Sequence, residues 1–151
     1  MSDWTDGLKK SVRKEVCNPR EKVWGVAAGL CVYLVNGPAI RKDIDIDFTE
    51  GGHNCRYGYI PRNEVWIENE ESEEERRFLL LHELFEHRLM DFEGLDYEAA
   101  HAQASSIEKD CRSNPNKLDA ALASEGWKNA KDHGDERSGD EHERRTATAT
   151  S

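Results

Sequence analysis

Apolar residues follow a helical period in the middle of the chain. Apolar residues recur at spacings of three and four through the stretch 78–90 (FLLLHELFEHRLM), which is typical of an amphipathic helix. Before it stand Ser72 and, three positions later, Glu75, the pattern of a capping box. Gly94 follows it and is a residue type that commonly ends helices. We therefore predict a helix from about residue 73 to residue 92.

Two more helices are predicted downstream. The first should run from about residue 97 to residue 112, because Asn114-Pro115 follows and proline disfavours a helical conformation in the residue before it. A shorter one should begin after Asn116 and end at Gly126. Helices are thus expected to fill most of the second half of the chain.

The first half has the character of strands. The stretch 23–35 (VWGVAAGLCVYLV) is apolar but shorter than the roughly 20 residues that cross a bilayer. Its second half is β-branched and aromatic, and Asn36-Gly37 follows it. These features predict a buried strand that enters a hairpin at Asn36-Gly37.

Further strands are predicted between this hairpin and the first helix. Residues 43–48 alternate aspartate with isoleucine or phenylalanine, a period-2 pattern that predicts a strand with one solvent-exposed face. Gly51-Gly52 should end that strand, and residues 56–60 and 64–68 should form two others. The expected fold class is α+β: an antiparallel sheet of three or four strands packed against two or three helices.

Composition divides the chain into three parts. Its 151 residues suit one domain. Hydrophobic residues make up 36% and charged residues 34%, a low apolar share that predicts unpacked ends. We expect a polar arm over residues 1–22, one α+β domain over 23–130 and a disordered charged tail over 131–151.

The net charge of -10 argues against two classes of partner. An acidic surface repels phosphate backbones and anionic lipid headgroups, so we expect neither a nucleic acid nor a membrane as partner. The four cysteines form no CxxC pair, which indicates free thiols rather than a thiolate zinc site or a disulfide framework. We therefore expect a cytoplasmic protein.

Candidate chemistry lies on the first predicted helix. His82 and Glu86 are four residues apart, so they point about 40° from each other, and both lie within the apolar stripe. A carboxylate there costs several kcal/mol of desolvation unless it is paired. Residues at this spacing can reach one metal ion. Glu83, at about 100° from His82, lies where a general base would stand beside a metal-bound water.

The second predicted helix offers a third ligand. Its small residues Ala100 and Ala104 allow close packing, and Gly94 allows the two helices to fold back on each other. His101 could then approach His82 and Glu86 as a third ligand. Two histidines and a glutamate leave one open position, the pattern of a catalytic zinc site. Glu108 could orient His101 or act as a ligand in its place.

The segment His82-Glu83-Leu84-Phe85-Glu86, followed by a second helix with an inward His101, resembles the active-site helix of zincin metallopeptidases. It is especially similar to small intracellular domains of the ImmA/IrrE type. Residues 45–112 also resemble small uncharacterised bacterial and phage proteins. The zincin resemblance implies a zinc-activated water that attacks an amide, with Glu83 as general base and a peptide or protein substrate along the sheet edge.

The chain departs from the zincin motif H-E-x-x-H at its last position. Glu86 stands where the motif has histidine, and His87 lies one residue out of register. A carboxylate in place of an imidazole makes bound zinc less Lewis acidic. It also makes the site less selective, so Zn²⁺ is the first candidate and another divalent ion stays open.

Several of these residues also have a non-catalytic interpretation. His82 and Glu86 could be a buried structural pair in a non-catalytic phage or bacterial accessory or binding protein built on a zincin-like scaffold. His53 could approach the cleft, although nothing local requires it. His87 and Glu83 are predicted to form an exposed pair on the helix surface.

Overall fold

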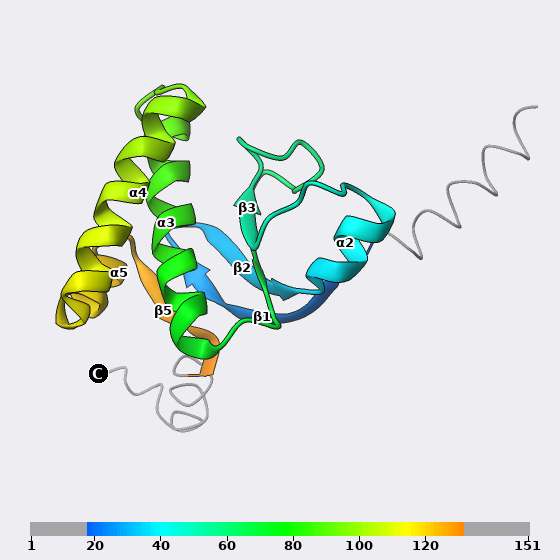
Figure 1. Ribbon diagram of the computed structural model, residues 1–151, viewed down its shortest axis with the longest axis horizontal. Helices are drawn as coiled ribbons and strands as arrows, with labels where there is room; N and C mark the ends of the chain where they lie inside the picture. The colour runs from blue at the N-terminus through cyan, green and yellow to red at the C-terminus, as the bar shows by residue number, and fades with distance from the viewer. Residues whose placement is uncertain (1–17, 132–151) are drawn as a thin grey trace, which may run out of the picture.

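The computed structural model describes residues 18–131, and within them the chain is an α+β protein with one mixed sheet of five strands (Figure 1). The predicted arm, apart from residues 18–22, and the predicted tail, apart from Lys131, lie outside the described residues. The first strand begins at Arg20, within the predicted arm.

The sheet has the strand order β3-β4-β2-β1-β5. Its strands are β1 (Arg20–Ala27), β2 (Leu30–Val35), β3 (Gly51–His53), β4 (Glu64–Glu68) and β5 (Trp127–Asn129). The prediction of three or four antiparallel strands is wrong in two respects. The sheet has five strands, and β2 and β4 run parallel. A parallel pair needs a long crossover, and residues 36–63 supply it.

The β1–β2 hairpin turns at a different place from the one predicted. Ala28 and Gly29 both have positive φ, 48° and 87°, as the two central residues of a tight hairpin turn require. Asn36 instead begins helix α2 (Gly37–Asp43), and its side chain accepts a hydrogen bond from the Ala39 N–H at 3.0 Å. The asparagine is therefore a helix cap rather than a turn residue.

The alternating stretch 43–48 is not a strand. Asp43 ends α2, and the Asp45 carboxylate accepts a hydrogen bond from the Asp47 N–H at 2.9 Å. This local bond favours a turn over a ladder. Residues 56–60 are also turns, whereas the prediction of a strand at 64–68 is confirmed by β4.

The predicted helices are confirmed. They are α3 (Glu73–Asp91), α4 (Tyr97–Ser113) and α5 (Leu118–Ser124), with the 3-10 turn η1 (Pro115–Lys117) before α5. The Ser72 hydroxyl accepts a hydrogen bond from the Glu75 N–H at 3.1 Å, as the capping box predicts. Gly94, with φ of 73°, makes the corner that lets α4 run back along α3. No helix in the described part of the chain is long and apolar enough to cross a membrane.

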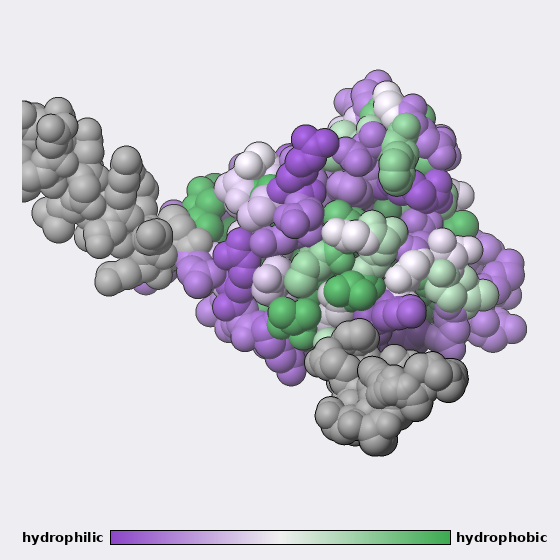
Figure 2. Space-filling view, turned by 180° about the vertical axis from the view of Figure 1, so that it is seen from behind, coloured by the Kyte–Doolittle hydropathy of each residue, from purple (hydrophilic) through white to green (hydrophobic). Residues whose placement is uncertain are grey.

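Each face of the sheet has its own hydrophobic cluster. Val32 and Leu34 of β2 pack with α3, α4 and α5, whereas Tyr33 and Val35 face α2 and the crossover. This alternation follows from the two-residue period of a strand. Along β1 the second face is open, since Val23 and Val26 are each 46% exposed. Hydrophobic side chains also gather on the surface seen from behind, between hydrophilic ones (Figure 2).

Candidate metal centre

Helix α3 carries three of the predicted site residues into the interior. His82, Glu83 and Glu86 are 7%, 8% and 2% exposed. They are buried because Leu81 and Leu84, on the same turns, pack in the cluster between the helices and the sheet. Burial of charged groups on this scale requires partners.

Three side chains converge at one point between α3 and α4. The His82 Nε2 atom lies 3.2 Å from Glu86 Oε2 and 3.1 Å from His101 Nδ1. His101 Nδ1 and Glu86 Oε2 are 2.8 Å apart. Imidazole nitrogen and carboxylate oxygen atoms this close need a proton or a cation between them, because their lone pairs would otherwise repel. We call His82, Glu86 and His101 the Glu86 cluster.

The Glu86 cluster fits a zinc ion. Two imidazole nitrogens and one carboxylate oxygen are zinc ligands, and three protein ligands leave a fourth position open. Ligand atoms around tetrahedral zinc, with bonds of about 2.0–2.1 Å, lie about 3.3 Å apart. The three ligand atoms, now 2.8, 3.1 and 3.2 Å apart, would therefore have to separate by only roughly 0.1–0.5 Å.

Carboxylate and imidazole groups outside the triangle orient its members. The Glu108 Oε1 atom lies 2.9 Å from His82 Nδ1, which must donate the proton because a carboxylate can only accept. This bond fixes the tautomer that turns Nε2 inward. On the other side, His53 Nε2 lies 2.8 Å from Glu86 Oε1. Each oxygen of Glu86 thus has imidazole partners.

These contacts shift the acid–base behaviour of the cluster. Burial alone would raise the pKa of Glu86, but hydrogen bonds from His53, His82 and His101 outweigh it and hold the pKa well below its usual range. Burial would lower the pKa of His82, yet the hydrogen bonds to Glu108 and Glu86 raise it to about 10. A metal ion would take the place of the proton that His82 otherwise holds.

Glu83 lies beside the triangle and belongs to a second group of potential ligands. Its Oε1 atom is 3.8 Å from His53 Nε2, and ligand atoms of His53, Glu83 and Glu86 lie within 4.8 Å of one another. Burial raises the pKa of Glu83 to about 7. A carboxyl group with that pKa can exchange a proton near neutral pH.

A cleft of about 220 Å³ gives access to these residues. Thr49, Glu50 and Gly51 line part of it, and Gly51 is the first residue of the edge strand β3. Tyr97 lies on the other side, where its ring stacks on His101 with 5.2 Å between centroids. The Arg56 guanidinium lies 4.6 Å from the centre of the Tyr97 ring. The cleft is therefore lined by residues at the start of a sheet edge as well as by ionisable residues.

The structure brings together all the residues predicted for the site, with two differences in their contacts. Glu108 contacts His82 and not His101. His87 and Glu83 are not an exposed pair, because both are buried. His87 faces away from the cleft, since it lies one residue, or about 100°, beyond Glu86 on the helix.

Little in the sequence indicated that His53 belongs to the site. His53 joins the cluster through the pairing of β3 with β4, which places His53 opposite Val65. The short strand was predicted as a break because glycines disfavour strands. Gly52 is needed there, since a Cβ atom would lie 2.4 Å from the ring of Tyr57. Glycine at a close backbone approach was the one available clue.

No family model matches this chain, and neither does any curated protein or solved structure.

Proposed function

We propose that this chain is a zinc-dependent hydrolase of the peptidase type, with the Glu86 cluster as its metal site. The observation that carries the proposal is the triangle formed by His82 Nε2, His101 Nδ1 and Glu86 Oε2, with sides of 2.8–3.2 Å. Bound zinc in such a site supplies Lewis acidity and lowers the pKa of a coordinated water.

Glu83 has the role of general base in this proposal. Its carboxyl lies in the wall of the same cleft and next to the metal ligands in sequence. Its pKa of about 7 is that of a group that takes up a proton and returns it to a leaving amine at neutral pH. Loss of a general base typically lowers turnover by about 10²–10⁴-fold.

The edge strand supports a peptide as the substrate. Within the described residues β3 pairs with β4 alone, and Thr49, Glu50 and Gly51 face the cleft. An extended peptide can add to such an edge through main-chain hydrogen bonds. Bound in this way, its backbone would pass the Glu86 cluster.

A second candidate function is a binding module in which the cluster is purely structural. Hydrogen bonds within the protein already satisfy His82, Glu86 and His101, as a buried polar network requires. A zincin-like accessory protein that lacks turnover would keep this network. Glu83 separates the two functions, because only an enzyme needs its carboxylate.

Metal content tests the proposal first. Zinc would be measured by elemental analysis of untagged protein, purified without chelator, for the wild type and His82→Ala. We expect His82→Ala to hold about one equivalent of zinc per chain less than the wild type. A wild type that holds no zinc at this site after zinc is added and the excess removed would overturn the enzyme proposal.

Turnover separates the enzyme from the binding module. Glu83→Gln should keep its zinc and lose peptide hydrolysis by about 10²–10⁴-fold. Glu74→Gln is a matched control, since Glu74 is exposed in the first turn of the same helix. Equal hydrolysis in both variants would rule out Glu83 as the base, and no hydrolysis in the wild type would favour the binding module.

A further inference from the structure

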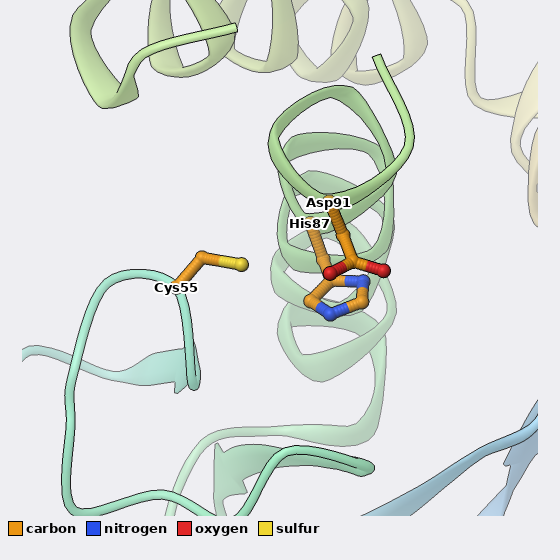
Figure 3. Close-up of side chains that lie close together, drawn as sticks. All are labelled: Cys55, His87 and Asp91. Carbon is orange, nitrogen blue, oxygen red and sulfur yellow. The ribbon is translucent and has the colours of Figure 1, made fainter. Parts of the chain in front are cut away.

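A third group of potential metal ligands lies on a neighbouring face of α3. His87 and Asp91 are one helical turn apart on α3, and Cys55 lies in the loop that follows β3. One ligand atom from each lies within 4.8 Å of the other two. Figure 3 shows the Cys55 side chain directed toward the His87 imidazole, with the Asp91 carboxylate beside the ring. We call these three residues the Cys55 cluster.

His87 carries the strongest sign that a ligand belongs here. The residue is 7% exposed, and its Nε2 atom is buried without a hydrogen-bond partner among the described residues. An unsatisfied buried polar atom costs about 1–3 kcal/mol. The ring of His53 packs edge-on against it, at 5.3 Å between centroids. The described residues therefore give His87 a place in the interior without giving its Nε2 a partner.

The Cys55 cluster does not have the contacts of a nucleophilic triad. A triad needs hydrogen bonds from the base to the nucleophile and to the orienting carboxylate. Within residues 18–131, no hydrogen bond joins His87 to Cys55 or to Asp91. Three groups that lie close together and do not bond to one another can instead share a cation.

The donor set selects the class of cation. A thiolate, an imidazole and a carboxylate suit zinc or a similar transition-metal ion, whereas magnesium and calcium prefer oxygen ligands throughout. His87 and Asp91 also line a cavity of about 650 Å³, together with Arg62 and the Ala28-Gly29 turn. A fourth ligand or a water could enter from that cavity.

We propose that Cys55, His87 and Asp91 form a second, zinc-type metal site, independent of the Glu86 cluster. The site ties the loop after β3 to the last turns of α3. Because Cys55 is two residues after His53, an ion at this site would also hold His53 in place against Glu86. Its role is that of a clamp between β3 and the helix.

Cobalt provides a direct test, because thiolate ligands give bound Co²⁺ an intense charge-transfer absorption that imidazole and carboxylate ligands do not. The full chain, freed of metal, would be titrated with Co²⁺. We expect a thiolate band in the wild type and in His82→Ala, and its loss in Cys55→Ser. Cys31→Ser is the matched control, since Cys31 is also a half-buried free cysteine, and it should keep the band.

A second measurement needs no variant that could misfold. Zinc should slow the alkylation of Cys55 by iodoacetamide in the wild type and leave the alkylation of Cys31 unchanged, as read by mass spectrometry of the peptides. Asp91→Asn, at an exposed position, should weaken this protection.

Two outcomes would overturn the second site. One is the absence of a thiolate band in the wild type together with no zinc protection of Cys55. The other is a band that persists in Cys55→Ser and disappears in Cys31→Ser. Neither outcome bears on the Glu86 cluster, which is tested separately by the zinc content of His82→Ala.

Discussion

The two clusters occupy neighbouring faces of α3 but are stabilised in different ways. In the Glu86 cluster the protein provides a partner for every potential ligand, through contacts of 2.8–3.2 Å. In the Cys55 cluster, the described residues leave His87 Nε2 unpartnered. The first cluster can therefore be stable with or without metal, whereas the second is completed only by a ligand from outside.

The comparison shows that closeness alone does not identify a metal site. A self-sufficient network stabilises the fold, so its ligands would be found together even in a protein that binds nothing. An unsatisfied atom in the interior is costly, so it points to a function more directly. The three predictions that follow act on this contrast.

The largest effect is expected from Glu86→Ala. The substitution removes the shared acceptor of His53, His82 and His101. Loss of one partner from a buried charged network costs about 3–5 kcal/mol. Urea unfolding in the presence of EDTA would measure the change in the free energy of unfolding.

Glu75→Ala on the same helix is the control for that experiment. Glu75 forms a half-exposed salt bridge with Arg112, and such pairs contribute about 0–1 kcal/mol. A loss in Glu86→Ala no larger than in Glu75→Ala would show that the Glu86 cluster does not stabilise the fold.

A smaller effect, confined to one cluster, is expected from Glu108→Gln. The change keeps the shape of the side chain but weakens the hydrogen bond that orients His82. Loss of such a partner lowers metal affinity about 10–100-fold. Competition with a chromophoric chelator would report zinc affinity, and Cys55 alkylation would report the other site.

Glu98→Gln is the matched control, because Glu98 is exposed in the first turn of α4 and should change neither reading. An equal loss of zinc affinity in both α4 variants would argue against an orienting role for Glu108.

The smallest effect is expected from Gly52→Ala, which acts on β3, the strand that carries His53 to Glu86 and leads into the loop with Cys55. A Cβ atom there would lie 2.4 Å from the Tyr57 ring. We expect a loss of about 1 kcal/mol, the lower end of the range for overpacked positions, because a side-chain ring can shift. Thermal or urea unfolding would measure it.

Gly58→Ala is the control for the glycine experiment, since a Cβ at Gly58 would meet nothing within 4 Å and the change should be neutral or slightly stabilising. If Gly52→Ala is also neutral, the close approach of β3 to Tyr57 does not position His53 or Cys55.

The helical half of the protein was predictable because its determinants are local. The capping box at Ser72, the apolar period of α3 and the corner at Gly94 each act within one or two turns. The same locality placed His82 and Glu86 on one face. It also made His101 a reasonable partner, since a short connection returns α4 along α3.

The crossover between β2 and β4 was not predictable by the same means. The alternation of residues 43–48 matched a strand, but local hydrogen bonds at Asn36 and Asp45 favour a helix and turns. Ile46, which the pattern made equivalent to Phe48, is 78% exposed while Phe48 is 2% exposed. The parallel pairing of β2 and β4 brings together segments far apart in sequence, and no local pattern encodes such a partner.

The sequence by itself determined the three helices of the second half and the pair of potential ligands on α3, because a helix fixes the relative directions of residues one turn apart. Only the tertiary structure decided that His53 and Cys55 reach neighbouring faces of that helix. Both depend on β3, a strand of three residues that exists because it pairs with β4. Its position is set by packing over long chain separations, and that packing turned His87 from an expected surface residue into a buried one.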